Sequence, residues 1–481
     1  MRVASVSTET WLVGGLIVLG AVLRFSTLGA QSYWYDEAQA AHELNLSLGS
    51  MLHSMGAVET APPLYFVLGW VWVHLFGAGE VALRSLSALA GTSLVAIAYL
   101  CGRELVSRRA GLLAAAFVAV NPFMVWYSQE AREYMLVGAL CGASLLFFLR
   151  SWRDPSPRNI AWWTLFSVLA LLTYYFAGFL VAPEALWLLY AARNRASLVA
   201  ATVVGLVELA LIPLLVGHTT AFVSGTHLST RIQEIPVGFM LGPPFETSLL
   251  SYGLIGAAVV IAVVIVLVIV GAATEELRGI GMAATLAGVV VLVPLLLAVL
   301  GSDYYIDRAL ILAWLPLAIV VAGACTTRRL WPLGAALAVV LLAAFAYGVI
   351  RIDTDTAYQR PDWRTVAEAL GSPSSQRAIV VYDELGSDPL DLYLRGVPWT
   401  GPAGEVAIRE IDVIGYSWQV PSQPLPPTVK LIAIRRVGES LVARFALVHE
   451  LRLTRPRIGA LAPILLGPAP VRPTVLVQRA S

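Results

Sequence analysis

Charge is scarce in this chain of 481 residues. Only 13% of the residues are Asp, Glu, Lys or Arg, whereas 58% are hydrophobic. A soluble domain usually carries about 25% charged residues, so this composition excludes an ordinary soluble protein. The 32 basic and 31 acidic residues nearly cancel and leave a net charge of +1. The sequence therefore offers no strongly basic surface, and we expect no nucleic-acid partner.

Cysteine is also rare. The three cysteines, Cys101, Cys141 and Cys325, lie within or beside apolar runs, and none belongs to a CxxC pair. This excludes a disulfide framework and a thiolate metal site. A glycine-rich loop of the kind that cradles phosphates is missing as well, so a nucleotide-linked substrate is not indicated.

Long apolar runs, in contrast, are abundant. A helix needs about 20 apolar residues to cross the hydrocarbon core of a membrane. Candidate spans lie near residues 11–29, 85–102, 110–127, 134–150, 160–175, 176–192, 197–216, 248–273, 281–300, 309–325 and 331–350. The first run could pass for a signal-peptide core. Because it continues to Leu28 and no small-x-small cleavage site follows, we expect an uncleaved anchor.

Basic residues mark one side of the predicted bundle. Four loops between spans carry them: Arg103, Arg108 and Arg109; Arg150, Arg153 and Arg158; Arg193 and Arg195; and Arg328 and Arg329. The positive-inside rule places these loops in the cytoplasm. Alternation is kept only if the apolar stretch 63–77 does not cross, so we expect an interfacial helix there. The sequence thus predicts a multi-pass protein of the cell (plasma) membrane with about 11 transmembrane helices and a cytoplasmic N-terminus.

The composition changes after residue 350. "DWRTVAEAL" predicts a short helix that Asp362 caps, and five segments predict strands: "RAIVVYDE", "EVAIREIDVI", "TVKLIAIRRV", "ARFALVHE" and "TVLVQ". We therefore expect a transmembrane domain over residues 1–350 and a small extracytoplasmic α/β domain over 351–481. Covering a cavity, choosing an acceptor and passive stabilisation are all roles open to that domain.

Three polar motifs fall on the outer side of this topology: "YWYDEAQ", "YSQEAREY" and "SDYYIDR". They bring acids and guanidinium groups to the depth of the lipid headgroups. Arginine suits phosphate because its planar fork donates two charge-assisted hydrogen bonds. Acids beside such arginines indicate a reaction on a lipid-linked phosphate. Each motif also has a simpler interpretation, since arginine and tyrosine are common interface anchors and loop acids are usually only solvated. Glu184 and Glu208, inside apolar runs, could be functional or could only pair helices.

The motifs, in order, resemble a known family. "YDEAQ", "APPLYF", "EVALRSLSAL", "NPFMVWYSQEAREYML", "DYYIDRALILAWLPLAI" and "PDWRTVAEAL" look like those of the polyprenyl-phosphate-sugar-dependent glycosyltransferases of the membrane GT-C fold. The most similar group comprises bacterial relatives of protein O-mannosyltransferases and aminoarabinose transferases. The resemblance covers about residues 10–370.

The resemblance implies an activity and roles for particular residues. Such enzymes move a sugar, a hexose or a pentose, from a polyprenyl phosphate to a hydroxyl of a lipid, glycan or protein outside the cytoplasm. Asp36 matches the acid of the first outer loop, the catalytic base, and Glu130 matches the second outer acid. Glu37, the other acid of this pair, is a further catalytic candidate, or it steadies the loop. The candidates for binding the donor phosphate are Arg132, Arg231, Tyr305 and Arg308. Those for the sugar or acceptor site are Tyr33, Tyr35, Tyr65 and Tyr127.

The metal requirement and two rival functions stay open at this stage. The family often has His or Lys before its PPLY element, where this chain has Ala61. That difference removes a candidate ligand, so we predict no required metal or other cofactor, although a divalent metal is compatible with the sequence. The chemistry agrees, because a phosphate leaving group needs charge stabilisation and the acceptor hydroxyl needs a base. A lipid or glycan transporter (flippase) is the main alternative; internal repeats and helices broken near mid-membrane would favour it, but the sequence shows no repeat and most of its charge sits at one face. A non-catalytic assembly scaffold is the second alternative.

Overall fold

The chain forms two compact units, which we describe separately. In the computed structural model the described residues are 7–55, 61–215, 223, 225–382, 386–394, 397, 404–415, 425–438, 440–466 and 473–479. The first unit comprises residues 1–28 and 44–359, and the second comprises residues 29–43 and 360–481. The segment that carries Asp36 and Glu37 is therefore grouped with the C-terminal part of the chain. The domain boundary expected from the sequence, between residues 350 and 351, remains a proposal.

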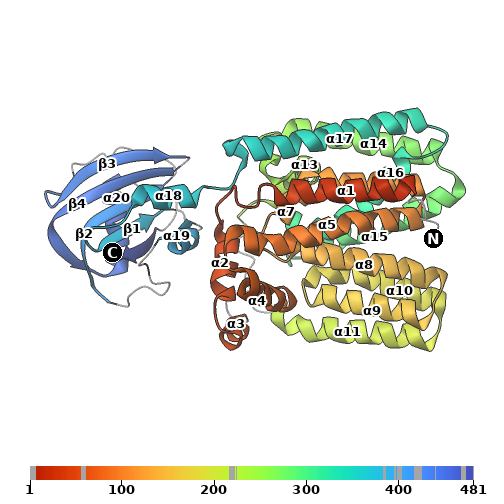
Figure 1. The fold of residues 1–481 in the computed structure, drawn as a ribbon, viewed down its shortest axis with the longest axis horizontal. Coiled ribbons are helices and arrows are strands. Elements are labelled where there is room, and N and C mark those ends of the chain that lie inside the picture. Colours follow the sequence, from red (N-terminus) through yellow and green to blue (C-terminus); the bar gives the residue numbers. More distant parts are fainter. Residues whose placement is uncertain are drawn as a thin grey trace, which may run out of the picture. The chain divides into compact units, whose positions relative to one another are not determined.

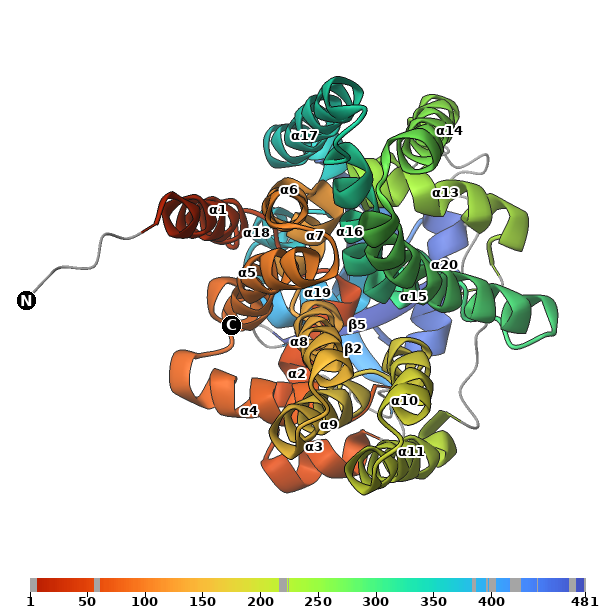
Figure 2. The ribbon, with the colours of Figure 1, turned by 90° about the vertical axis from the view of Figure 1, so that its right-hand side faces the viewer.

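The first unit is a bundle of long helices that lie side by side, seen along their length in Figure 1 and end-on in Figure 2. The helices that run along the bundle are α1 (Thr8–Phe25), α5 (Glu80–Leu105), α6 (Arg108–Val120), α7 (Pro122–Ser128), α8 (Tyr134–Arg153), α9 (Pro157–Leu171), α10 (Gly178–Ala192), α11 (Arg195–Leu215), α14 (Leu250–Val266), α15 (Thr274–Val299), α16 (Trp314–Cys325) and α17 (Trp331–Thr354). The other helical elements are α3 (Leu48–Ser54), α4 (Leu64–Phe76), η1 (Tyr175–Ala177), α13 (Leu228–Leu241), η2 (Pro243–Phe245), η3 (Leu267–Gly271), η4 (Asp307–Ala313) and η5 (Thr356–Tyr358).

The number of spans differs slightly from the expected number of about 11. Within the described residues, nine helices are long and apolar enough to cross a membrane, or up to 10 if the bent pair α6 and α7 counts as one span. The remaining expected run, residues 160–175, corresponds to α9, which has only 15 residues and is about 22 Å long. Helix α4 has 13 residues, too few for a hydrocarbon core of about 30 Å. The expectation that residues 63–77 do not cross is consistent with this length, and the predicted multi-pass helical fold is confirmed.

A buried polar cluster joins three helices of the bundle. Glu184 of α10 is fully buried, and its carboxylate accepts hydrogen bonds from Ser144 of α8 at 2.6 Å and from the Trp163 indole of α9 at 2.9 Å. Ser144 also hydrogen-bonds to Ser167 of α9. A polar group within an apolar bundle is costly unless it is hydrogen-bonded, so these contacts favour helix pairing as the role of Glu184.

The second unit contains a five-stranded mixed sheet of order β3-β4-β2-β1-β5. The strands are β1 (Arg377–Val381), β2 (Val406–Gly415), β3 (Val429–Val437), β4 (Ser440–Leu453) and β5 (Thr474–Gln478). Only β1 and β2 pair in parallel; the other neighbours are antiparallel. One face packs against α20 (Arg455–Leu466) and the other against α18 (Trp363–Leu370) and α19 (Ser387–Tyr393). All five expected strand segments are confirmed.

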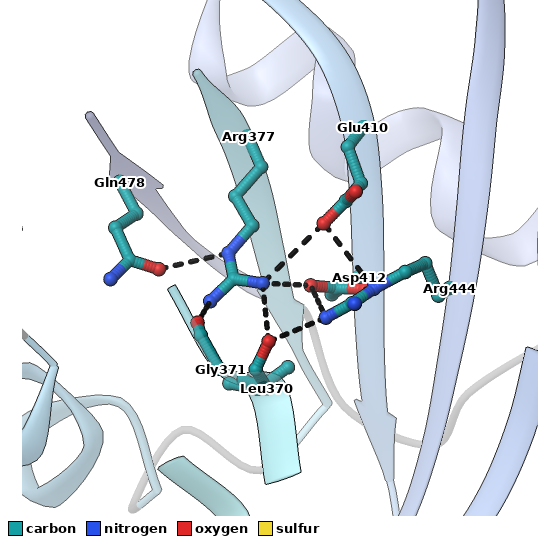
Figure 3. A network of polar contacts seen from close by, with 7 residues as sticks. All are labelled: Leu370, Gly371, Arg377, Glu410, Asp412, Arg444 and Gln478. Carbon is teal, nitrogen blue, oxygen red and sulfur yellow. Dashed lines mark hydrogen bonds and ion pairs between the residues drawn. The ribbon is translucent and has the colours of Figure 1, made fainter. Parts of the chain in front are cut away.

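Buried charges fix α18 to this sheet. Asp362 caps the helix as expected, because its carboxylate accepts a hydrogen bond from the Thr365 amide at 3.2 Å. At the other end, Arg377 and Arg444 both donate to the carbonyl oxygen of Leu370, at 2.8 and 2.6 Å. The same two guanidinium groups bind the Asp412 carboxylate at 2.9 and 2.8 Å, as Figure 3 shows. Arg377 and Asp412 are fully buried, so mutual pairing is what makes their burial tolerable.

Candidate active site

The "YSQEAREY" motif begins where a membrane helix is broken. Pro122 has no N–H group, so the carbonyl oxygen of Val118 loses its partner in the helix. Arg24 of α1, fully buried, supplies the missing donors: its Nη2 lies 2.8 Å from the Val118 oxygen and its Nη1 lies 2.9 Å from the Ala119 oxygen. In an apolar setting freed carbonyls must be satisfied within the protein. Arg24 thus stabilises the break that presents the motif.

The motif is also tied to the end of α1. Arg24 Nε donates to Ser128 Oγ at 2.9 Å, and Gln129 Nε2 donates to the Leu23 carbonyl and to Thr27 Oγ1, at 3.1 and 2.7 Å. Gly91 of α5 makes room for this contact, because a Cβ there would lie 2.1 Å from Ser128 Oγ. The serine and glutamine of the motif therefore fix its position and leave the charged residues that follow for other roles.

The charged part of the motif is buried. Glu130, Arg132 and Glu133 are 1%, 7% and 2% exposed. Arg132 Nε lies 3.0 Å from a Glu133 carboxylate oxygen, and its guanidinium lies 5.9 Å from the centre of the Phe66 ring. Ser87 of α5 donates a hydrogen bond to the Arg132 carbonyl at 3.0 Å. A donor phosphate would therefore share Arg132 with Glu133.

The structure brings this motif to the "SDYYIDR" motif, far away in sequence. The Tyr127 hydroxyl donates to an Asp307 carboxylate oxygen at 2.5 Å. The charges of Asp307, Glu130 and Arg308 all act on the Tyr127 phenol. The charges of Glu133, Arg308, Arg132 and Asp307 likewise act on Tyr174. Acids, arginines and tyrosines from four separate helix ends thus form one electrostatic cluster, and Arg132, Glu130, Tyr127 and Arg308 of the predicted site belong to it.

Aromatic rings continue from this cluster. The centroids of Tyr127 and Tyr134 are 5.3 Å apart, and those of Tyr134 and Tyr174 are 6.0 Å apart, both edge to face. Phe176 then contacts Tyr304 with a centroid distance of 5.8 Å. Rings with hydroxyl groups can offer an apolar face and a polar edge at once, which suits a sugar or a phosphate headgroup.

Two other predicted residues, Arg231 and Tyr305, lie beside the cluster. Arg231 of α13 forms a bidentate pair with Asp303, at 2.9 and 2.5 Å, and its Nη1 donates to the Tyr305 carbonyl at 2.6 Å. These hydrogen bonds from Arg231 lower the pKa of Asp303. The pair holds the 303–308 segment against α13, so phosphate binding by Arg231 would compete with Asp303. Tyr305 is 4% exposed, with its ring in an apolar cluster with Ile235.

A cavity of about 210 Å³ opens between the same elements. Its charged lining residues are Arg231, Glu234, Glu246, Asp307 and Arg308. Burial, reinforced by the nearby carboxylates of Asp307 and Glu234, raises the pKa of Glu246. A protonated carboxyl can donate a hydrogen bond, so Glu246 could face an anionic or hydroxyl group that enters beside Arg308.

The first outer motif lies in the second unit. Asp36 is the second residue of α2 (Tyr35–Leu44) and is half-buried. Glu37 is fully buried, and its carboxylate accepts a long hydrogen bond, 3.5 Å, from the Trp34 amide before the helix. That contact resembles one half of a capping box and agrees with a loop-steadying role. Tyr33 is buried, and the Tyr35 hydroxyl accepts a hydrogen bond from Gln39 at 2.7 Å.

The remaining predicted residue, Tyr65, belongs to α4 in the first unit. It is fully buried and packs edge to face on Phe66, with centroids 5.6 Å apart. The Leu64 amide donates to the Leu172 carbonyl at 2.9 Å, which connects the start of α4 to the end of α9. Tyr65 thus contacts Phe66, and the Phe66 ring in turn faces the Arg132 guanidinium.

Among the residues that the structure describes, no group of three His, Cys, Asp or Glu side chains is arranged to hold a metal ion. Ala61, at the position where the family often has His or Lys, is buried. The cluster instead offers arginine guanidinium groups and tyrosine hydroxyls, which can donate hydrogen bonds directly to a phosphate.

Sequence reasoning missed several residues of the cluster and of the adjoining cavity. Glu133 and Asp307 stand inside the quoted motifs, but their roles became visible only through their partners, Arg132 and Tyr127. Tyr174 and Glu246 lie outside the motifs. The only signal for Tyr174 is its place at the junction of two spans, and Glu246 is a lone acid in a largely apolar loop.

Comparison with known proteins supports the resemblance of the motifs. Residues 60–216 match the sequence model of the family described as dolichyl-phosphate-mannose-protein mannosyltransferase. This stretch includes all of "APPLYF" and "YSQEAREY" but neither "YDEAQ" nor "SDYYIDR". It is a third of the chain. No curated protein matches the sequence.

Solved structures match over almost the whole length. The chain resembles ArnT from Cupriavidus metallidurans bound to undecaprenyl phosphate, with a TM-score of 0.55 and 14% identity, over 91% of this chain and 98% of ArnT. The same protein in the apo state gives a TM-score of 0.53 at 14% identity, with the same coverage. At this level of identity the likeness shows the fold, and it confirms the expected GT-C architecture.

Proposed function

We propose that the chain is a membrane glycosyltransferase that moves a sugar from a polyprenyl-phosphate donor to an acceptor hydroxyl. The observation that carries this proposal is the cluster of Tyr127, Glu130, Asp307 and Arg308, built from helix ends of a GT-C fold. The similar ArnT was solved with undecaprenyl phosphate, the kind of ligand whose phosphate such a cluster suits. We propose a hexose or a pentose as the sugar, and a lipid, glycan or protein as the acceptor.

The chemistry divides between charge stabilisation and proton removal. The leaving group is a phosphate anion, which arginine guanidinium groups and tyrosine hydroxyls can stabilise. We assign this role first to Arg308, which lines the cavity, with Arg132, Arg231 and Tyr305 as further candidates. The acceptor hydroxyl must lose a proton, and we assign Asp36 as the base. Glu130 and Glu37 are the other acids of the proposed site, and Tyr33, Tyr35, Tyr65 and Tyr127 are the proposed sugar or acceptor contacts.

The activity is tested with the purified full-length protein in detergent or lipid vesicles. We expect incubation with a radiolabelled polyprenyl-phosphate sugar and a cell-envelope extract to yield a labelled acceptor and free polyprenyl phosphate. A flippase would move the donor between leaflets without forming a product, so fluorescently labelled donor in vesicles distinguishes the two. Movement of the donor without any transfer, across a panel of hexose and pentose donors, would contradict the proposal.

We further propose that the N-terminus is cytoplasmic and that the second unit is extracytoplasmic, in the cell membrane. The argument is the positive charge of the loops at one end of the helices, since arginine-rich loops stay in the cytoplasm. All three native cysteines are buried, which makes the wild-type chain a suitable background for single reporter cysteines.

Labelling of intact cells should show this orientation. Asn45→Cys, at an exposed position beyond α2, is expected to react with a membrane-impermeant maleimide. Arg195→Cys, equally exposed at the start of α11, should react only after permeabilisation. The opposite pattern would invert the proposed topology.

A further inference from the structure

We propose that the C-terminal part of the second unit positions the helix that carries Asp36, and that Ser32 and Tyr393 are the positioning residues. The inference rests on the proposed function, because it assigns to this part of the chain the placement of the base. All of its contacts lie within the second unit.

Ser32 anchors the chain just before α2. Its side chain is 1% exposed, and its Oγ donates to the Pro361 carbonyl and accepts from the Trp363 amide, both at 3.0 Å. The first amides of a helix have no partner within the helix, so Ser32 satisfies one such group at the start of α18. Beside it, the Arg360 amide donates to Gln31 Oε1 at 2.9 Å. The segment before Asp36 is thus built into the N-terminus of α18.

Tyr393 supplies a second anchor from α19. Its hydroxyl accepts a hydrogen bond from the Tyr33 amide at 2.7 Å. On the other side of Asp36, the Gln39 amide lies beside Asp388, also in α19, where it partly offsets the rise in pKa that burial causes at that carboxyl. Contacts therefore flank residue 36 in the chain, at Ser32 and Tyr33 before it and at Gln39 after it. Anchors on both sides fix the direction as well as the position of the first turn of α2.

The anchoring elements are themselves rigidly held. Arg377 and Arg444 bind the C-terminal carbonyl of α18 to the sheet (Figure 3). Gly386 immediately precedes α19, and an added Cβ there would lie 2.1 Å from the Trp363 ring, so the start of α19 approaches α18 as closely as a glycine allows. Reactive groups are placed most accurately when the residues that support them sit on packed elements. This unit has the structure expected of such a support.

Weakening an anchor should therefore slow the reaction without affecting donor binding. A base acts only within hydrogen-bond reach of the proton that it removes, and a misplacement of about 1 Å can cost about 100-fold in rate. For Tyr393→Phe and Ser32→Ala we expect kcat to fall about 10- to 100-fold, with donor Kd unchanged. Arg409→Ala is the control in the same unit, because it removes an ion pair with Glu450 between β2 and β4.

A double-mutant cycle distinguishes positioning from general destabilisation. If Tyr393 acts through Asp36, then Tyr393→Phe added to Asp36→Asn should lower the rate no further. A full additional loss in the Asp36→Asn background, or wild-type kcat in both anchor variants, would overturn the inference.

Amide hydrogen exchange gives a second readout that needs no activity. Faster exchange is expected over residues 32–44 in the two anchor variants but not in Arg409→Ala. Unchanged exchange over residues 32–44 in both anchor variants would also contradict the inference. If the wild-type protein transferred no sugar, the proposed function would fail, whereas the exchange experiment would still report whether these residues hold the segment.

Discussion

Replacing Asp36 by asparagine is expected to lower the rate of sugar transfer by about 10²–10⁴-fold, the usual contribution of general-base catalysis. Asparagine has nearly the same size and keeps the hydrogen-bonding shape, but its amide cannot take up a proton. Asp36 is half-buried at the first turn of α2, so the substitution should leave the helix folded. Single-turnover transfer with a labelled donor measures the rate, and donor binding, measured separately, should stay close to that of the wild type.

Glu37→Gln is the matched control for this experiment. The two acids are adjacent on α2, but Glu37 is fully buried and its carboxylate accepts a hydrogen bond from the Trp34 amide. The side-chain oxygen of a glutamine can keep this contact. We therefore expect a smaller loss in Glu37→Gln than in Asp36→Asn. Near-normal turnover of Asp36→Asn would refute Asp36 as the base, and Glu130 would then be the next acid to test.

Much of the fold could be predicted because membrane spans and strands leave local signals. The apolar runs located the long helices, and alternating β-branched segments located all five strands. The span count was less certain because α9, with 15 residues, is too short to cross on length alone. Helices α19 and α20 were missed, and both are short segments with prolines in or near them.

The composition of the cluster could not be predicted, because it depends on how the helices rotate against one another. Tyr127 and Asp307 are 180 residues apart in sequence, and Arg231 and Asp303 are 72 apart. Hydrophobic periodicity does not specify which polar side chains meet at the helix ends. Arg24 illustrates the same limit, since no feature of the α1 sequence indicates that Arg24 donates hydrogen bonds to carbonyl groups of α6.

Ion pairing affects which substitutions can test the arginines that are predicted to bind the donor phosphate. Arg132 and Arg231 each bind an acid, Glu133 and Asp303. Removing one member of a buried ion pair leaves the other charge uncompensated and typically costs about 3–5 kcal/mol. Arg132→Ala is therefore expected to destabilise the protein as well as weaken donor binding, so Arg132→Lys, which keeps the charge, is the better probe there.

Arg308→Ala is the second substitution with a large expected effect, a loss of about 10- to 100-fold in affinity for the polyprenyl-phosphate donor. A hydrogen bond to a charged group contributes about 1.5–3 kcal/mol, and Arg308 lines the cavity beside the Tyr127–Asp307 pair. Arg308→Lys should fall between the wild type and the alanine variant, because lysine keeps the charge but loses the planar fork. Affinity is measured by titrating the purified protein with a fluorescent polyprenyl phosphate.

Arg351→Ala provides the charge-matched control for this titration. Arg351 lies in the last turn of α17, partly exposed and paired with Asp355 at 2.6 Å. It has the features of an interface anchor, so its removal should leave the affinity unchanged while lowering the net charge by the same amount. Equal losses in Arg308→Ala and Arg351→Ala would indicate a general electrostatic attraction to the anionic lipid. Wild-type affinity in both Arg308→Ala and Arg132→Lys would argue that these arginines only anchor the protein at the membrane surface.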